Sequence, residues 1–363
     1  MRRALFAALC LALPARMAAQ DSARAITLGG FVDTYFAWDF NRPGPASFDR
    51  AFTTQPARHD EFNVNLAYVD LKLSGPGARG RLALQAGTSV QANYAAEPQT
   101  GAVSGPSLAR DIQEAVVGVR AAKGLWIDAG VYLSHIGQES WISRDNPTYS
   151  RSMIADFSPY YEAGVKATWT ATPRLTAQLH VLNGWQNVAE TNHDKALGVR
   201  LDYVVSPRLS VGYANFIGNE APDTAASRLR VFNEVLAAVT AGRWQAWITL
   251  DYGVQRRAPA GGTSAWYGGA LVARWVAGTT VAIAARLEGF ADPDGVVVAT
   301  GGGTSSGFRA TGASLGVDVS PAPGTLWRTE LRGLAARHAV FAAGGGNVEA
   351  DDVFVVSSLA LTL

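Results

Sequence analysis

The chain is poor in several features that mark common classes of protein. Its only cysteine, Cys10, lies close to the N-terminus, so the remainder of the 363 residues can form neither a disulfide nor a thiolate metal site. Beyond the N-terminal segment, no apolar run approaches the roughly 18 residues of a membrane-spanning helix. Basic residues are not in excess, at 31 Lys+Arg against 30 Asp+Glu, which excludes a nucleic-acid surface built on net positive charge.

The N-terminal segment has the composition of an export signal. Arg2 and Arg3 precede an apolar stretch over 4–13 that is too short to cross a bilayer, and Ala18 and Ala19 supply small residues for cleavage. We therefore expect a signal peptide over 1–20 and a mature protein over 21–363. The alternative is an N-terminal membrane anchor or a buried helix. Export to an oxidising compartment agrees with the lack of thiols.

The dominant pattern in the rest of the chain is strict alternation of apolar and polar residues. Leu175, Ala177, Leu179 and Val181, for example, are separated by single polar residues. Alternation of this length predicts a β-strand with one apolar and one polar face. No segment after the signal shows convincing helical spacing, so the chain is expected to be all-β.

Runs of this kind predict about sixteen strands, each long enough to cross a membrane when tilted. Short connections that contain Gly or Pro alternate with long polar connections. This rhythm predicts a transmembrane antiparallel up-and-down β-barrel with short periplasmic turns and long extracellular loops. The expected strands are 26–39, 61–74, 80–94, 111–122, 124–135, 158–171, 174–184, 194–206, 208–218, 228–240, 243–256, 264–276, 279–290, 307–319, 325–337 and 350–363.

Aromatic residues on the apolar faces support the barrel, because they fall into two belts at the expected membrane interfaces. The belt near the long loops comprises Trp38, Tyr213, Tyr252 and Tyr267, and the belt near the short turns comprises Trp169, Tyr203, Trp244, Trp275 and Trp327. A soluble β-sandwich is the competing fold. The strand over 61–74 reverses its parity, which predicts a β-bulge near Ala67 and Tyr68 and leaves fourteen or eighteen strands open.

If the apolar faces meet lipid, the polar faces line an aqueous lumen, where we expect charged side chains to stay hydrated. The densest cationic groups are Arg228 with Arg230 and Arg328 with Arg332. Because both signs are mixed, strong ion selectivity is not predicted. The pore-lining candidates are Arg200, Arg228, Arg230, Glu234, Arg286, Glu288, Arg328, Glu330 and Arg332.

The third long loop, at about 136–157, is the candidate constriction. It is aromatic and carries both charges. In general sixteen-stranded porins the third loop folds into the barrel and narrows it, which is an analogy at the level of the fold. An ordinary surface loop is the alternative. The constriction-loop candidates are Glu139, Arg144, Asp145 and Arg151.

The sequence shows no constellation for catalysis or for binding a metal or cofactor. The five histidines lie far apart in the sequence, and none has a metal-ligand spacing such as HExxH. His59 with its acidic neighbours, or His135 with Glu139, could hold a cation only weakly. The run at 301–303 lies between expected strands rather than before a helix, so it predicts no phosphate-binding loop. We expect no enzyme activity, no metal and no cofactor.

Several short segments resemble a known family of membrane proteins. They are Gly29-Gly30-Phe31-Val32-Asp33-Thr34-Tyr35, Ile112-Gln113-Glu114-Ala115, His135-Ile136-Gly137, Asn146-Pro147-Thr148-Tyr149-Ser150-Arg151-Ser152 and Val181-Leu182-Asn183-Gly184-Trp185. In these segments the chain is similar to the β-barrel porin-2 family, also called OmpL-like. The C-terminal Leu363 departs from the aromatic residue that ends many outer-membrane proteins, which puts recognition during assembly in doubt.

The resemblance implies a porin of the bacterial outer membrane, surrounded by lipid. Small hydrophilic solutes or ions would diffuse passively through its water-filled barrel. Similar porins are often trimers, so a homotrimer is one expected state. The alternative function is a structural or adhesive barrel with a blocked lumen, whose long extracellular loops bind a partner.

Overall fold

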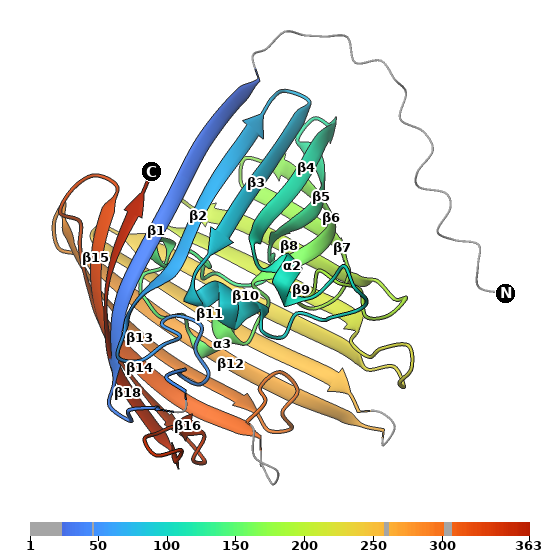
Figure 1. The fold of residues 1–363 in the computed structure, drawn as a ribbon. Coiled ribbons are helices and arrows are strands. Elements are labelled where there is room, and N and C mark those ends of the chain that lie inside the picture. Colours follow the sequence, from blue (N-terminus) through green and yellow to red (C-terminus); the bar gives the residue numbers. More distant parts are fainter. Residues whose placement is uncertain (1–23, 46, 258–260, 301–306) are drawn as a thin grey trace.

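The computed structural model describes residues 24–45, 47–257, 261–300 and 307–363. In this part of the chain sixteen antiparallel strands close into a barrel (Figure 1). Each strand pairs with its neighbours in sequence, and the last strand pairs with the first. The barrel strands are β1 (Ala25–Asp39), β2 (Phe62–Ser74), β3 (Ala78–Ala86), β4 (Ile112–Ala122), β5 (Leu125–Leu133), β6 (Tyr161–Thr172), β7 (Leu175–Leu182), β8 (Ala196–Ser206), β9 (Leu209–Asn219), β10 (Leu229–Ala241), β11 (Trp244–Arg256), β12 (Thr263–Val276), β13 (Val281–Asp292), β14 (Phe308–Val319), β15 (Thr325–Ala336) and β18 (Asp351–Thr362).

The connections between strands alternate in length around the barrel. Short ones such as 207–208 and 242–243 join strands at one rim, and long ones such as 134–160 join them at the other. The predicted sixteen-stranded barrel is confirmed, and the β-sandwich and the other strand counts are wrong. The assignment of the two rims to periplasm and exterior stays a prediction. The expected signal peptide over 1–20 lies outside the described residues.

The long connections hold short elements that the alternation did not predict. No helix among the described residues has both the length and the hydropathy of a membrane span. The short elements are α1 (Thr88–Tyr94), α2 (Pro106–Ala109), a 3-10 turn (Ser143–Asp145), α3 (Met153–Asp156) and the hairpin of β16 (Phe341–Ala342) and β17 (Val348–Glu349).

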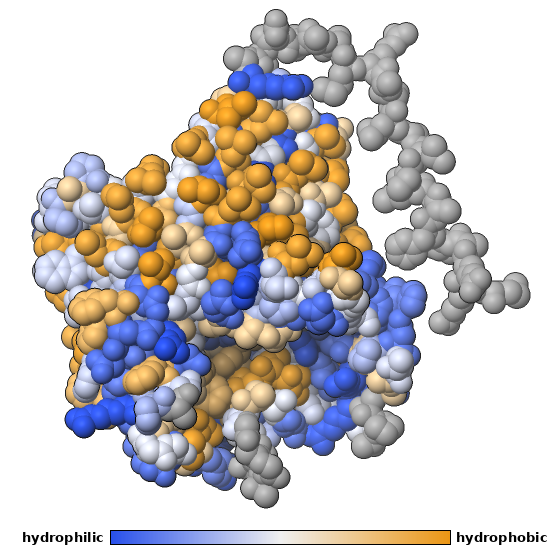
Figure 2. Space-filling view, in the orientation of Figure 1, coloured by the Kyte–Doolittle hydropathy of each residue, from blue (hydrophilic) through white to orange (hydrophobic). Residues whose placement is uncertain are grey.

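The outer wall of the barrel is apolar and exposed. Ile248, Leu271 and Leu287 lie side by side on β11, β12 and β13, and they are 41%, 48% and 62% exposed. Hydrophobic side chains gather over the strands in Figure 2, and hydrophilic ones gather toward the rim of long loops. An apolar band of this kind fits hydrocarbon rather than water as the outer solvent.

Aromatic residues pair at both ends of this band. Tyr252 on β11 lies opposite Tyr267 on β12 near the long loops, and Trp244 lies opposite Trp275 near the short turns. All four are on the outer face of the wall, as expected for the two interfacial belts of a membrane barrel.

A β-bulge in β2 is present, but two residues earlier than predicted. Asp33 on β1 pairs with Leu66 and Thr34 pairs with Val64, so Asn65 has no partner of its own in the register. The bulge restores a common outward face to both halves of β2. It also turns Leu66 inward, where this side chain is fully buried, although its parity with Val64 had suggested the outer face.

The strand predicted over 80–94 is wrong in its second half. β3 ends at Ala86, and the next residue, Gly87, has a φ of +141°. A Cβ at this position would lie 2.3 Å from the carbonyl oxygen of Asn65, so only glycine fits. The chain continues as α1, in which Val90 and Tyr94 are fully buried four residues apart.

Replacing Leu271 by arginine tests the lipid-facing assignment. We expect it to lower the free energy of unfolding in a bilayer by about 2–4 kcal/mol, because a cation on the outer wall near mid-barrel must enter hydrocarbon. Urea unfolding of protein folded into vesicles measures this. The control is Val103→Arg, since Val103 is 85% exposed in the connection between β3 and β4. Equal effects at the two positions would contradict the assignment.

Candidate functional site

The connection between β5 and β6, residues 134–160, lies inside the barrel; we call it the lumen loop. It hydrogen-bonds to inward-facing side chains around the whole wall, so the inward position is confirmed and the ordinary surface loop is wrong. The wall partners include Asp33 on β1, Arg200 on β8, Glu234 on β10, Arg286 on β13 and Glu330 on β15.

Ser150 is the central anchor of the lumen loop on β13 and β15. Its backbone N–H and its hydroxyl donate to the two carboxylate oxygens of Glu330, at 2.7 and 2.8 Å. Arg286 donates to the carbonyl and the hydroxyl oxygen of Ser150, at 2.6 and 2.8 Å. Arg286 also pairs with Glu288 at 3.1 Å. Burial of these charges is tolerated because each has charge-assisted hydrogen bonds.

Arg328 holds the part of the loop that precedes Ser150. Its guanidinium pairs with Asp318 at 2.6 Å and donates to the carbonyl oxygens of Ser143, Asn146 and Thr148. Five rigid N–H donors make arginine suited to gathering several carbonyls at once. The 3-10 turn is therefore fixed to the wall through its backbone.

The expectation that the lumen charges stay hydrated is wrong for this side of the barrel. The side chains there are close to fully buried because the lumen loop fills the space that water would occupy. Ion pairs and hydrogen bonds replace hydration: Arg332, for example, donates to Glu288 at 2.9 Å. The buried predicted residues are Arg286, Glu288, Arg328, Glu330 and Arg332.

The other pore-lining candidates lie on β8 and β10 or just before β10. Arg200 donates to the carbonyl oxygens of His135 and Gly137 in the lumen loop. Arg230 is buried and stacks over Trp185 at 5.1 Å from the ring centroid. Arg228 was predicted to begin the strand, but β10 begins at Leu229, so Arg228 lies in the preceding connection. Whether these residues line a conducting path stays a prediction.

The four candidates in the lumen loop separate into different environments. Glu139 accepts a hydrogen bond from the backbone N–H of Ser152 at 2.9 Å. Arg144 donates to the carbonyl oxygen of Gly324 at 2.8 Å, near the turn before β15. Asp145 is exposed, and partial desolvation of its carboxyl raises its pKa. Arg151 is buried, with its guanidinium carbon 3.5 Å from the ring centroid of Tyr160, so it packs rather than faces water.

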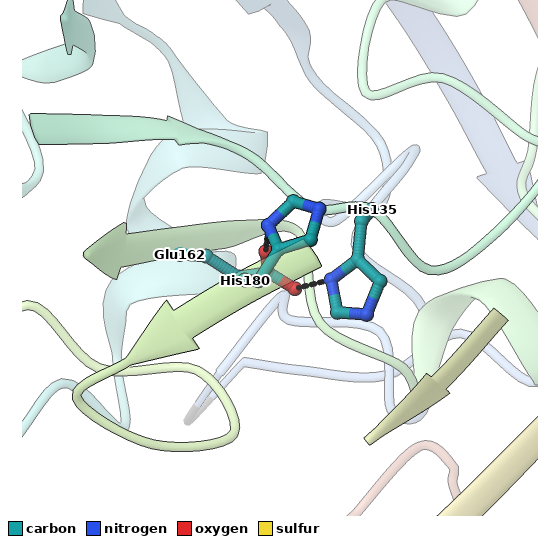
Figure 3. Close-up of side chains that lie close together, drawn as sticks. All are labelled: His135, Glu162 and His180. Carbon is teal, nitrogen blue, oxygen red and sulfur yellow. Dashed lines mark hydrogen bonds and ion pairs between the residues drawn. The ribbon is translucent and has the colours of Figure 1, made fainter. Parts of the chain in front are cut away.

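The base of the lumen loop is held by two histidines that share one carboxylate (Figure 3). The Nδ1 atom of His135 lies 2.7 Å from one oxygen of Glu162 on β6, and Nδ1 of His180 on β7 lies 3.7 Å from the other. The Nε2 atom of His135 lies 2.8 Å from the carbonyl oxygen of Asn215, so a protonated His135 can donate at both ends. The sequence separates these histidines widely, and they are brought together by the pairing of β5 with β6 and of β6 with β7.

The ligand atoms of His135, Glu162 and His180 lie within 4.8 Å of one another, a spacing that a metal could in principle bridge. The imidazoles are stacked, however, with centroids 4.2 Å apart and planes at 24°. Their in-plane lone pairs therefore do not converge on one point, as coordination requires. The arrangement fits a carboxylate between two imidazoles better than a metal centre.

Three cavities follow the lumen loop along the barrel. The first, of about 280 Å³, reaches Gln245 and Ser320 near the short turns. The second, of about 10 Å³, lies between Glu139 of the loop and Glu234 of β10. The third, of about 370 Å³, reaches Gln186 at the rim of long loops. The second has room for about one water molecule and is the smallest of the three.

Sequence reasoning missed the uncharged residues that join the loop to the wall. Ser143 donates to Asp33 at 2.7 Å, and Ser150 is the anchor described above. Neither serine carries a charge or lies in a periodic pattern that would have marked it as a site residue. The only signal for Ser150 was its place in the segment 146–152, which carried the family resemblance.

A closed sixteen-stranded barrel with an apolar outer band and a loop folded across its lumen is the architecture of an outer-membrane porin. The model of the family described as "Putative beta-barrel porin-2, OmpL-like" matches residues 25–363. The chain belongs to this family, and is thus an outer-membrane porin. A search of curated protein sequences gave no match.

Solved structures with the same fold are porins and channels of low sequence identity. An anion-selective porin from Comamonas acidovorans is 13% identical, with a TM-score of 0.61 over 94% of this chain and 100% of that chain. The outer-membrane channel DcaP of Acinetobacter baumannii is 10% identical, with a TM-score of 0.61 over 94% and 97%. The trimer form of OmpT from Vibrio cholerae is 9% identical, with a TM-score of 0.59 over 94% and 100%. At this identity the likeness concerns the fold alone.

The base of the lumen loop should make stability depend on pH. Burial opposes the charged form of His135, but the charge and hydrogen bond of Glu162 outweigh it, so the pKa of His135 is raised. Because the pKa of His135 is raised in the folded state, its protonation contributes to the free energy of unfolding. This contribution is complete below the usual histidine pKa of about 6.5 and is lost as the pH rises through the pKa of the folded state. We expect the free energy of unfolding to fall by at most about 1.4 kcal/mol per pH unit across that window.

Unfolding measured at a series of pH values tests this expectation. His135→Gln should remove the dependence, and His193→Gln, at an exposed loop position, should leave it unchanged. A slope that survives in the His135 variant would contradict the assignment.

Proposed function

We propose that the three cavities form one narrow path for passive diffusion through the barrel. The first and second cavities share Gln138, Glu139 and Thr249 in their lining, so they adjoin. The second is lined by Ala155, and the third by the next residues, Asp156 and Phe157. This succession of spaces along the lumen loop, from Gln245 near the short turns to Gln186 at the rim of long loops, is the observation that carries the proposal. Ions and the smallest hydrophilic solutes are the expected cargo, because the middle space has room for about one water molecule.

A barrel with a blocked lumen is the second candidate function. The observation that favours it is the span of the lumen loop, which contacts β1, β8, β10, β13 and β15. In such a barrel the long loops would bind a partner at the cell surface. The two candidates differ in whether the folded protein conducts.

Planar-bilayer recording separates the two candidates. We expect discrete conductance steps from the purified, folded protein. Replacing residues 143–150 by a Gly-Ser sequence of equal length should raise the conductance at least about twofold, because a barrel of sixteen strands without an inserted loop has an open aqueous lumen. Replacing residues 224–226, in an exposed connection, should not change it.

Liposome swelling with sugars of increasing size gives the second measurement. The wild-type path should exclude sugars that the loop variant admits. A folded wild-type protein that never conducts, beside a loop variant that does, would contradict the open path and favour the blocked barrel.

We also propose that the protein assembles as a homotrimer through the outer face of β1, β18 and β15. Three hydroxyl residues interrupt the apolar band there; we call Thr34, Thr329 and Ser357 the hydroxyl patch. They bond within the wall: Trp327 donates to Ser357 at 2.9 Å, and Thr329 lies 3.2 Å from Ser357. A groove of about 640 Å³ passes over Thr34 and Ser357 of this patch. A neighbouring protomer would cover hydroxyls that lipid cannot hydrogen-bond, and the OmpT structure is described as a trimer form.

The variant Ser357→Trp should place a bulky ring in this groove and shift the trimer to monomers. Light scattering in detergent and chemical cross-linking measure the oligomeric state. The matched control is Val211→Trp, on the outer face of β9 away from the patch. A monomeric wild type would contradict the trimer, and a trimeric Ser357 variant would contradict the choice of face.

A further inference from the structure

We propose that the cavity near the short turns binds a small amphipathic anion, a single carboxylate on a flat apolar body as in an aromatic acid. The body would lie against apolar side chains on the inner faces of β11 and β12, and the carboxylate would accept hydrogen bonds from Arg274. The site goes beyond the proposed path, because binding does not require that any solute crosses the barrel.

The wall of this cavity carries apolar side chains, although the lumen of a porin is usually polar. Trp247 on β11 is paired in register with Val272 on β12, and both line the cavity. Ala270 on β12 and Leu326 on β15 also line it. Water next to apolar side chains is unfavourable in free energy, and an apolar ligand would displace this water.

Arg274 supplies a cation beside this apolar surface. It lies two residues beyond Val272 on the same inner face, and it is paired in register with Gln245. Its guanidinium donates to the side-chain oxygen of Gln245 and to Asp318, both at 3.3 Å, which is long for hydrogen bonds from a charged group. Its side chain is 27% exposed, so a ligand in the cavity can reach it.

The charge of Arg274 is only partly compensated, because Asp318 serves two arginines. Arg328 donates to both carboxylate oxygens of Asp318, at 2.6 and 2.9 Å, and is the closer partner. Its remaining donors bind carbonyl oxygens of the lumen loop, as described above. Arg274 therefore keeps both charge and donors for a further acceptor, and a carboxylate is the group whose geometry matches a guanidinium.

The lumen loop closes the other side of the cavity and limits what it can hold. Asn146 and Pro147 line that side, with Arg144 and Asp145, which carry opposite charges. The volume of about 280 Å³ is near the lower end of the range for small-molecule sites, which is about 300–1,000 Å³. Glu139 lies where this cavity adjoins the middle one, so a second negative group on the ligand would meet a carboxylate there. The site thus favours a small monoanion.

Isothermal titration calorimetry of the folded protein in detergent, with sodium benzoate at constant ionic strength, tests the site. We expect saturable binding of benzoate. Benzyl alcohol, which has the ring without the charge, should bind at least about tenfold more weakly, because it cannot form charge-assisted hydrogen bonds with Arg274. Equal affinities for the two compounds would overturn the role of the cation.

Two substitutions separate the cation from the apolar surface. Arg274→Gln should lower the affinity for benzoate at least about tenfold, and Val272→Thr should lower it about threefold, because a hydroxyl replaces a methyl group on the apolar surface. The matched control is Arg243→Gln, since Arg243 is exposed in the turn before β11 at the same rim. Asp318 retains Arg328 in the Arg274 variant, and heat-modifiable migration in gels checks that each variant is folded.

The site and the path fail in different ways. A folded wild type that does not bind benzoate, or an affinity that falls equally in the Arg274 and Arg243 variants, would overturn the site and leave the path intact. Binding by a protein that never conducts would support the site and overturn the path. In a conducting protein, benzoate added at the short-turn side should reduce the potassium chloride current. Reduction only from the long-loop side would contradict the location, because the middle cavity has room for about one water molecule.

Discussion

In the hydrocarbon of a membrane a backbone N–H or C=O has no water to bond, so each must find a partner within the protein. Closure of the barrel meets this constraint. The pairing of β1 with β18, from Phe31 opposite Thr362 to Asp39 opposite Phe354, removes the two edges that an open sheet would leave. The even number of strands follows from antiparallel closure, and the alternation of faces follows from the two-residue repeat of a strand. The outer wall can then be mainly apolar, while the inner wall is free to carry charge.

The same constraint acts inside the barrel in a second form. A charged side chain on the inner wall must be met either by water or by protein. On β13 and β15 it is met by the lumen loop, whose backbone carbonyls and Ser150 take the place of water around Arg286, Arg328 and Glu330. Loop and wall are therefore mutually dependent: removal of the loop exposes the charges to water, and removal of the charges leaves the loop without its anchors.

Local pattern was sufficient to predict the barrel but not its contents. Strand positions depend on alternation along a few residues, and for this reason all sixteen strands could be predicted. The errors lie at the bulge near Asn65 and at Gly87, because at each of these positions one backbone conformation determines the local structure. The lumen loop depends instead on contacts between residues more than a hundred positions apart, such as Ser143 with Asp33 and Ser150 with Glu330. Nothing in the local sequence records such contacts. The sequence was sufficient to predict that charged residues alternate onto the inward face. It was not sufficient to predict that water is excluded from these charges.

The parts of the inner wall differ in which charged side chains form ion pairs, rather than in how the charges themselves are distributed. Counting charges along the strands gives a mixture of signs and suggests no selectivity. Some of these charges neutralise one another, as with Arg286 and Glu288 or Arg328 and Asp318. Pairs on β13 and β15 fix the loop and contribute little net field to the path, because each pair is close to neutral at a distance. Of the acids on β10 and β11, only Glu234 lines the middle cavity, and Asp251 lies opposite Glu234 in the strand register. The lumen loop is thus held by paired charges on β13 to β15 and by single side chains on β1, β8 and β10, so its position depends on contacts spread over several strands and not on one group of ion pairs.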